Sequence, residues 1–542
     1  MLINRFLKYF TLLAILAGCA RTDDSILPTT DWLDEYDQMT AGDPTTMQYG
    51  RFSDGYGDIA TDDAQSRRIA VLLPLTGQNA SVGKTIRTSV ETAVLQNAPK
   101  NLTVTFHDTN RDFAETINTV LSENPSVIVG PVFADRVRTL RDAKSPDLPV
   151  ISFTSDATAL GNGVLTMNLM PTNSVETIIQ EMKSDGVQRF IIMAPDTTSG
   201  HLMAGTAKNA SSIYEIPLIG IFYYNEKDPE SIKNISATAS MNAARTSAHT
   251  RARQVLSDIL INERITALEK SSLNTQLEKL AKTDTVGSVP YDAVLFLGNG
   301  DDTKSLASFL RYYNVGARDA KFYGTTMWDG SDIASDFTMA GAKFATLPPT
   351  SPEFSELYTS VSGSAPSRLA SIGYDATNIA IGTIYSGKST ASYLLDPSGY
   401  NGTDGLFRMK PTGESERGLR IVQLNNSPTP TDVKASPVNF ITPLYNIEQR
   451  HITPAAAMDL QTTGIDPDDH INIPERLRFK YRSKTLGANT TVLPTIEKSQ
   501  IVSITPATDD DITIRAENYT PIRLESVKRS IIEEYEIYED EE

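Results

Sequence analysis

The chain has 542 residues, with 49 Lys or Arg against 67 Asp or Glu, and its formal net charge is −18. This length has room for about two to four domains of ordinary size, and the apolar fraction of 40% is enough to form hydrophobic cores. A surface that wraps a phosphate backbone needs clustered Lys and Arg, so nucleic acid is not expected as a partner.

Cysteine and histidine usage narrows the chemistry further. Cys19 is the only cysteine, which excludes an intrachain disulfide framework and Cys-ligated zinc or iron–sulfur sites. The five histidines are scattered, and no two have the spacing of a metal-ligand pair. No combination of residues suggests a nucleophile or an acid–base pair. We therefore expect no cofactor, no metal and no catalytic residues, and predict that the protein is not an enzyme.

The N-terminus predicts export. A positively charged start precedes the apolar run Phe10 to Ala17, which is too short to span a bilayer of about 30 Å. Leu16-Ala17-Gly18-Cys19 then resembles a bacterial lipobox. Residues 1–18 are predicted to be a lipoprotein signal peptide and Cys19 to be lipidated; the alternative is an ordinary secretory signal with an incidental cysteine. Ala20 follows, where an aspartate often marks retention in the inner membrane, so the periplasmic side of the outer membrane is favoured.

Residues 19–66 are predicted to form an acidic tether. The stretch is rich in Asp, Gly, Pro and Thr, has only Arg21 and Arg51 as bases, and shows no sustained apolar period. Such a segment allows a folded domain to lie at a distance from the bilayer surface.

At Arg67 apolar runs begin to alternate with helical patterns. The run Ile69 to Leu73 is apolar throughout, as expected of a central parallel strand buried on both faces. Ser81 is a candidate N-cap for the following helix, in which apolar residues recur every fourth position. Further strands are expected at 102–106, 127–129 and 150–153, and helices at 113–121 and 133–143. This order predicts a doubly wound α/β domain with a parallel sheet.

A second alternation of the same kind starts near Leu169. Strands are expected at 190–193, 218–223, 293–297 and 322–324, and helices at 175–182, 200–211 and 304–312. A polar, helix-prone stretch at about 228–283 interrupts this second alternation. The predicted architecture is therefore two doubly wound α/β lobes with a helical insertion.

Several motifs resemble one known family. The motifs that show this resemblance in the first lobe are Ile69 to Gly77, Val127-Ile128-Val129-Gly130-Pro131 and Leu148 to Ser152. With these motifs, the first lobe looks like that of type-1 periplasmic binding proteins, the leucine-binding protein family. The closing segment of that family is also recognisable. It is similar to Tyr374-Asp375-Ala376, which is expected to open a helix, to the hairpin Tyr400 to Phe407, and to Arg417 to Ile421. The resemblance covers about residues 67–425, and it implies the type-1 periplasmic binding protein fold.

Within that family, the Leu-Leu-Pro-Leu-Thr-Gly start and the Val-Ile-Val-Gly-Pro motif on a lipoprotein look most like the penicillin-binding protein activators. The resemblance implies an outer-membrane lipoprotein that stimulates a peptidoglycan synthase. The activators also carry a helical repeat domain before the binding-protein module, and this chain has the acidic tether there.

The resemblance also points to a ligand cleft between the lobes. In the amino-acid binders, a Ser-rich loop and an Ala-x-Thr stretch hold the ligand carboxylate, and an acid in the second lobe holds its ammonium. Here the acid after Phe-x-Gly is replaced by Thr326, so Asp156 or Asp196 would have to take its place. The other interpretation is that these residues are loop caps and turn formers. The candidate ligand-binding residues are Thr76, Gln78, Phe133, Thr154, Ser155, Asp156, Asp196 and Thr326.

A phosphate-loop-like stretch lies at the end of the first strand. Gly77 and Gly83 flank five residues before Lys84 and Thr85, whereas the phosphate cradle needs four, so nucleotide binding is disfavoured. At the other end of the chain, residues 426–542 are predicted to form an irregular extension with an acidic tail, which has seven acids in its last ten residues.

The leading hypothesis is a lipid-anchored, non-enzymatic activator or scaffold of peptidoglycan synthesis, with a peptidoglycan synthase as partner. The alternative is a substrate-binding lipoprotein that captures an amino acid or similar small solute for ABC-type transport. In the leading hypothesis the cleft is vestigial or regulatory, whereas in the alternative the cleft captures the transported solute.

Overall fold

A computed structural model describes side chains over residues 67–99, 101–440 and 464–481, and in addition the backbone of strands within 45–46 and 501–525. The predicted signal peptide, Cys19, nearly all of the tether and the acidic tail lie outside the described residues. The described chain divides into two compact units. The first contains residues 67–173, 347–419 and 436–440, and the second contains 174–346, 420–435 and 464–481.

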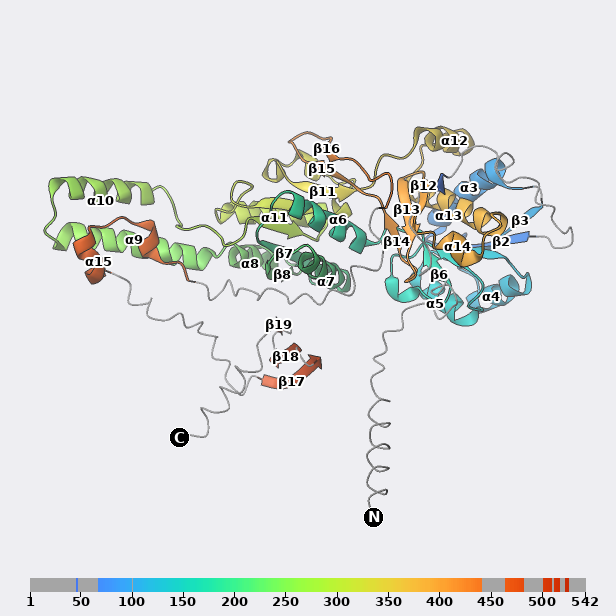
Figure 1. Ribbon diagram of the computed structural model, residues 1–542, viewed down its shortest axis with the longest axis horizontal. Coiled ribbons are helices and arrows are strands. Elements are labelled where there is room, and N and C mark those ends of the chain that lie inside the picture. The colour runs from blue at the N-terminus through green and yellow to red at the C-terminus, as the bar shows by residue number, and fades with distance from the viewer. Residues whose placement is uncertain are drawn as a thin grey trace, which may run out of the picture. The chain divides into compact units, whose positions relative to one another are not determined.

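The first unit is built on a five-stranded parallel sheet with the strand order β3-β2-β4-β5-β6. Its strands are β2 (Arg67–Leu73), β3 (Leu102–Asp108), β4 (Val127–Val129), β5 (Val150–Ser152) and β6 (Val164–Thr166). Helix α3 (Ala80–Asn97) covers one face, and α4 (Phe113–Ser122) and α5 (Ala134–Ala143) cover the other (Figure 1).

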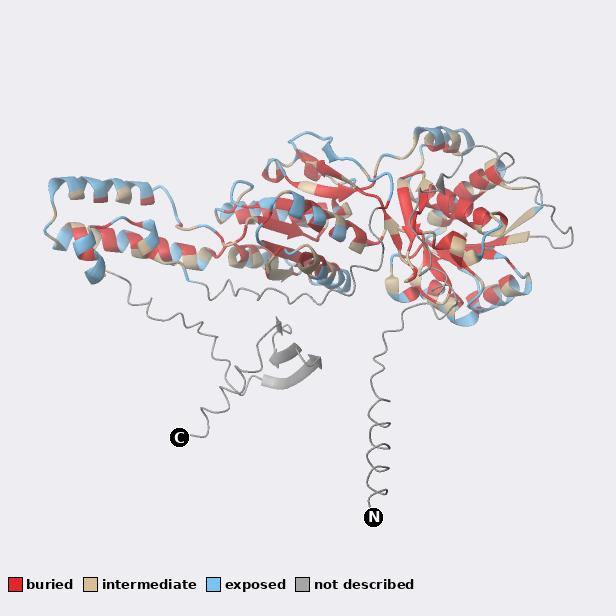
Figure 2. Cartoon of the chain, in the orientation of Figure 1, coloured by how far each residue is buried: buried red, intermediate tan, exposed pale blue. Residues whose placement is uncertain are grey.

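Strand β2 shows why a continuous apolar run suits the centre of this sheet. Ile69, Val71 and Leu73 pack into the core beneath α3, whereas Ala70 and Leu72 pack on the side of α4 and α5. The exposed surface of all five residues is 0%. Figure 2 shows that the strands inside this unit are largely buried. Successive residues of a strand face opposite sides, so a strand covered on both faces must be apolar at every position.

Segments later in the chain, together with the short strand β1 near its start, complete the first unit. Helices α12 (Pro352–Ser362), α13 (Arg368–Tyr385) and α14 (Thr390–Leu394) precede a small sheet with the order β1-β12-β13-β14. Its strands are β1 (Thr45–Thr46), β12 (Tyr400–Gly402), β13 (Gly405–Met409) and β14 (Ser415–Arg417). Helix α13 is buried along nearly its whole length because it packs against both α3 and the sheet.

The second unit contains a seven-stranded sheet with the order β16-β15-β11-β10-β9-β7-β8. The parallel strands are β7 (Phe190–Pro195), β8 (Leu218–Tyr224), β9 (Ala293–Phe296), β10 (Lys321–Gly324) and β11 (Lys343–Thr346). Antiparallel β15 (Arg420–Gln423) and β16 (Thr431–Lys434) extend it at one edge. Helix α6 (Pro171–Ser184) precedes β7, helix α7 (Thr198–Ile213) connects β7 to β8, and helix α11 (Gly300–Tyr312) connects β9 to β10.

The helical insertion belongs to the second unit. It consists of α8 (Pro229–Ala239), α9 (Asn242–Asn262) and α10 (Ala267–Leu280), and α15 (Glu475–Tyr481) lies against α9 and α10 (Figure 1). Arg245 joins the base of α9 to the rest of the unit, since its guanidinium donates to the carbonyls of Gly287, Tyr313 and Asn314. The three-stranded antiparallel sheet of β17 (Ile501–Thr508), β18 (Asp511–Ala516) and β19 (Ile522–Glu525) follows.

The predicted fold class is confirmed: two doubly wound α/β units are present, with a helical insertion in the second. Two local predictions were wrong. Asn79, not Ser81, is the N-cap of α3, and Ser81 lies within its first turn. Asp375 does not open a helix but lies in the middle of α13, whose N-cap is Ser367. Among the residues that the structure describes, no helix has the length and apolar character needed to cross a bilayer.

Candidate functional site

Six of the predicted ligand-binding residues share one sheet edge in the first unit. Thr76 and Gln78 follow β2, Phe133 is the N-cap of α5 after β4, and the stretch Thr154 to Asp156 follows β5. Strands β2, β4 and β5 are parallel neighbours, so their carboxyl ends meet at the same edge. Ligands of doubly wound folds bind at such edges.

Asp108, at the end of β3, organises the loop that carries Thr76. Its carboxylate accepts hydrogen bonds from the Thr76 hydroxyl at 2.6 Å and from the backbone N–H groups of Leu75 at 2.9 Å and Asn110 at 3.1 Å. Burial raises the pKa of Asp108, but the hydrogen bonds outweigh this and hold it below its ordinary value. The carboxylate therefore stays charged and fixes the loop, while Thr76 and Gln78 remain exposed.

The loop after β5 is held by its own polar groups. The carboxylate of Asp156 accepts from the backbone and the hydroxyl of Thr158, at 2.9 and 2.7 Å, and forms an ion pair with Arg138. These contacts lower the pKa of Asp156, with the Thr158 hydroxyl as the largest cause. Thr154 is buried and its hydroxyl accepts from the Asp156 N–H, whereas Ser155 is exposed. Asp156 thus caps a short 3-10 helix and already has a cationic partner.

Two glycines of the sequence motifs allow close backbone packing. Gly130 has φ +95°, and a Cβ atom there would lie 2.2 Å from the Leu72 carbonyl oxygen on the neighbouring strand β2. At Gly83 a Cβ atom would lie 2.2 Å from the Pro74 carbonyl oxygen. The glycine of the phosphate-loop-like stretch therefore allows α3 to approach the end of β2, which accounts for it without a nucleotide.

The remaining two predicted residues belong to the second unit. Asp196 follows β7 and Thr326 follows β10, and these strands lie on either side of β9, so both residues are at the carboxyl edge of that sheet. The Asp196 carboxylate lies 2.7 Å from Nε2 of His201, whose ring stacks on Tyr223 with centroids 4.0 Å apart. The hydroxyl of Thr326 is 3.4 Å from that of Ser174. A ligand-binding role for all eight residues remains a prediction.

A buried charged cluster in the first unit was not predicted. Asp375 of α13 has no exposed surface, and its carboxylate accepts from the backbone N–H and the hydroxyl of Thr403, each at 3.1 Å. Asp404, also fully buried, accepts from Arg368 at 2.8 Å and from Thr350 at 2.7 Å. The cluster holds the turn between β12 and β13 against the middle and the start of α13.

Arg417 of β14 supplies the buried positive charge. It is 2% exposed, its Nη2 donates to the Met167 carbonyl at 2.6 Å, and its backbone N–H donates to the Asn173 side chain at 2.8 Å. Burial lowers its pKa, against the attraction of Asp375 and Asp404. Burial also raises the pKa of Asp375 to about 7, although Arg417 and the Thr403 hydrogen bonds oppose the change.

These residues stand within the motifs that carry the family resemblance. Asp375 is the centre of Tyr-Asp-Ala, Asp404 is in the hairpin, and Arg417 begins the closing segment. The signal available in the sequence was the presence of charged residues inside these motifs, at a helix position (Asp375), a hairpin turn (Asp404) and a strand position (Arg417). Charged residues are seldom fully buried unless they are paired. Within the described part of the chain, no group of three or more His, Cys, Asp or Glu residues is placed to hold a metal ion.

Curated relatives match part of the chain. The "Penicillin-binding protein activator LpoA" of Mannheimia succiniciproducens is 24% identical over 198 residues, which are 36% of this chain and 34% of that protein. The protein of the same name from Vibrio cholerae is 26% identical over 152 residues, or 26% of this chain and 25% of that one. The alignments thus span about a third or less of the relatives' own length.

A solved structure confirms the fold. A Rhodospirillum rubrum protein described as a putative branched-chain amino acid ABC transporter superposes with a TM-score of 0.50 at 14% identity, covering 68% of this chain and 100% of that one. At this identity the likeness concerns the fold alone, and the fold is the two-lobed type-1 periplasmic binding protein architecture that the motifs implied. The family model described as "LppC putative lipoprotein" matches residues 59–396, which is more than half of the chain. The chain therefore belongs to the LppC lipoprotein family.

Proposed function

We propose that the protein is a lipid-anchored, non-enzymatic module on the periplasmic side of the outer membrane, and that it activates or scaffolds a peptidoglycan synthase of the penicillin-binding protein class. The observation that carries this proposal is family membership over residues 59–396, together with relatives named penicillin-binding protein activators. The motif Leu16-Ala17-Gly18-Cys19 supports attachment through a lipid.

Activation of this kind needs binding rather than chemistry. A protein that binds the active conformation of an enzyme more tightly than its inactive conformation shifts the population toward the active one. The two compact α/β units, each with a buried hydrophobic core, provide surfaces for such binding.

The activity is tested with the purified full-length mature chain and a peptidoglycan synthase from the same cell. We expect the two to co-purify, and we expect glycan polymerisation or peptide cross-linking to accelerate as the protein is added. Absence of both binding and acceleration would contradict the proposal. Measuring both readouts matters, because a scaffold binds without accelerating.

The anchor is tested by two neighbouring substitutions. Cys19→Ala should prevent lipidation and release the protein from the membrane fraction. Ala20→Asp keeps the cysteine and should leave the protein lipidated, but retained in the inner membrane. Recovery of Cys19→Ala in the outer membrane would rule out the proposed attachment.

The second candidate is capture of a small solute for ABC-type transport, with Thr76, Gln78, Phe133, Thr154, Ser155, Asp156, Asp196 and Thr326 around the ligand. The fold supports this candidate, since the Rhodospirillum rubrum protein of similar fold is described as a putative branched-chain amino acid ABC transporter. The contacts of the two candidate acids weigh against an amino acid, because Asp156 is paired with Arg138 and Asp196 with His201. A thermal-shift screen with amino acids, peptides and muropeptides tests it, since a ligand that binds the native state raises the stability by RT ln(1 + [L]/Kd).

A further inference from the structure

The hairpin of α9 and α10 is covered by a segment that comes much later in the chain. Residues 464–481, here called the strap, contribute Ile471, Ile473 and Leu477 to the hydrophobic cluster of the hairpin. On the hairpin side this cluster contains Ala252, Val255, Leu256 and Ile259 of α9 and Leu273 and Leu280 of α10. The hairpin thus presents an apolar groove, and the strap occupies it.

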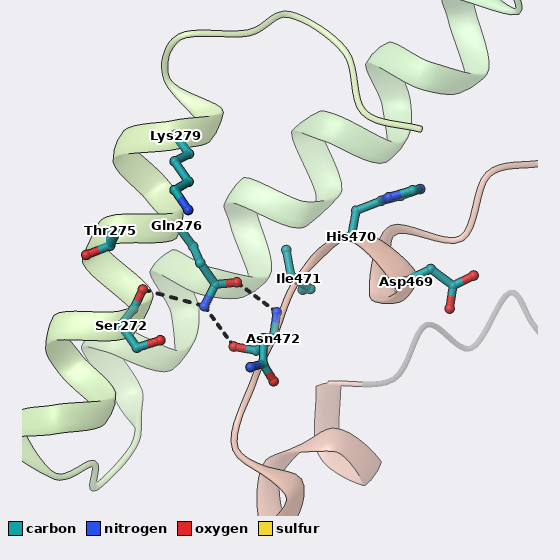
Figure 3. Close-up of a pocket in the computed structure, with 8 residues that line it drawn as sticks. All are labelled: Ser272, Thr275, Gln276, Lys279, Asp469, His470, Ile471 and Asn472. Carbon is teal, nitrogen blue, oxygen red and sulfur yellow. Dashed lines mark hydrogen bonds between the residues drawn. The ribbon is translucent and has the colours of Figure 1, made fainter. Parts of the chain in front are cut away.

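Gln276 of α10 holds the backbone of the strap. Its side-chain nitrogen donates to the Asn472 carbonyl at 2.9 Å, and its side-chain oxygen accepts from the Asn472 N–H at 2.7 Å (Figure 3). A carboxamide that pairs with both main-chain groups of one residue fixes a peptide whatever the side chain of that residue is. This contact therefore recognises an extended backbone, flanked by Ile471 and Ile473 in the groove.

Two acids of the hairpin receive the basic residues of the strap. The guanidinium of Arg476 pairs with both carboxylate oxygens of Glu269, and Lys480 pairs with Glu263. Glu269 also belongs to the capping box of α10, in which it accepts from the Thr266 backbone at 2.7 Å. Its carboxylate is thus held in place by the hairpin itself, so the acceptor for a basic side chain is preformed.

The strap has the properties of an exchangeable occupant. Its helix α15 is only seven residues long, and a helix of that length is not stable without a partner surface. The basic side chains of its ion pairs are exposed, Arg476 by 52% and Lys480 by 63%, although Glu269 and Glu263 are exposed by only 23% and 13%. Ion pairs at a protein surface contribute little individually. Beside it, a pocket of about 490 Å³ lies between α10 and the strap and is lined by Ser272, Lys279 and His470, among others (Figure 3). This pocket is mostly polar and adjoins the apolar groove at Ile471.

We propose that the α9–α10 hairpin is a peptide-docking groove and that the strap is its resident competitor. The occupant is a segment of a partner protein with the chemistry of the strap. The first part of this segment has an extended backbone and two aliphatic residues spaced like Ile471 and Ile473. The second part is a short helix that contains a leucine and two basic residues four positions apart. The partner docks by displacing the strap. This inference does not rest on the proposed function.

The test uses the full chain and a fluorescein-labelled synthetic peptide of residues 464–481, with binding measured by fluorescence anisotropy. Arg476→Glu places a negative charge opposite Glu269 and releases the resident strap, so the peptide should bind this variant at least tenfold more tightly than the unmodified chain. Arg478→Glu is the matched control, because the partner of Arg478 among the described residues is Glu475 of the strap itself. It should bind the peptide as weakly as the unmodified chain does.

Recognition is tested from the groove side in the Arg476→Glu background. Gln276→Ala should weaken peptide binding at least fivefold, whereas Asn274→Ala, at an exposed neighbouring position of α10, should not change it. Equal peptide affinity in the Arg476→Glu and Arg478→Glu chains, or equal binding of a peptide that itself carries Arg476→Glu, would overturn the proposal.

If Arg476→Glu unfolds the hairpin, a measurement on the unmodified chain tests whether the peptide displaces the strap. Excess peptide should accelerate amide hydrogen exchange in the strap, around Ile471 to Leu477, while α9 and α10 stay protected. Unchanged exchange of the strap at the highest peptide concentration would refute displacement.

Discussion

The buried carboxyl of Asp375 makes the stability of the first unit depend on pH in a defined direction. In the unfolded chain this group has its ordinary pKa of 3.8, and in the folded protein burial raises its pKa to about 7. Between these two values the folded state binds a proton that the unfolded state has lost. The free energy of unfolding must therefore fall as pH rises from about 4 to about 7, and the contribution levels off above that.

The size of the effect follows from the two pKa values. A difference of one pKa unit corresponds to about 1.4 kcal/mol in the free energy of unfolding. The rise in the pKa of Asp375 from 3.8 to about 7 therefore changes that free energy by about 4 kcal/mol. Asp375→Asn keeps the shape of the side chain and stays neutral at every pH, so it removes this contribution. Relative to the unmodified chain, the variant should gain up to about 4 kcal/mol of stability between pH 4 and pH 8.

Urea unfolding followed by circular dichroism at several pH values measures this difference, and the comparison with the variant cancels the contributions of other titrating groups. Thr403→Val removes one hydrogen bond to the carboxylate, so the pKa of Asp375 should rise further and the midpoint of the pH dependence should move upward. A stability difference between Asp375→Asn and the unmodified chain that is independent of pH, or that shrinks with rising pH, would refute the reasoning.

Three further changes test the fold. Gly130→Ala should lower the free energy of unfolding in urea by about 2 kcal/mol or more, because φ is positive there and a Cβ atom would contact Leu72. Gly186→Ala is the control: φ is also positive but the space is open, so the loss should be only about 1 kcal/mol. Arg245→Met should accelerate amide exchange at the base of α9, since it leaves carbonyl groups without their donor, and unchanged exchange would contradict its anchoring role. Trp328→Phe loses the indole N–H bond to a threonine hydroxyl and should cost about 1 to 2 kcal/mol in the same urea assay; no loss would show that bond to be dispensable.

Much of the fold was predictable because strands buried on both faces leave a strong signal. The run Ile69 to Leu73 and the later apolar runs of the second unit all correspond to parallel strands. Helix ends were less predictable. Asn79 and Ser81 are both good N-cap residues, and only the path of the chain after β2 places the first turn at Ala80.

The contacts that join distant segments could not be predicted. The sequence does not show that Thr403 donates to Asp375, or that Gln276 holds Asn472 from 196 positions away. Such pairs depend on the packing of the finished fold and leave no periodic pattern. The place of the strap within residues 426–542 could not be predicted for the same reason, since the apolar face that the strap covers belongs to another part of the chain.

The central claim, that this LppC-family protein activates peptidoglycan synthesis, is tested most directly by the rate of a purified peptidoglycan synthase with increasing amounts of the full-length mature chain. The account predicts a saturable increase in glycan polymerisation or cross-linking that depends on the folded protein and is lost on heat denaturation. A rate that stays constant across the titration, with no complex between the two proteins, would contradict it.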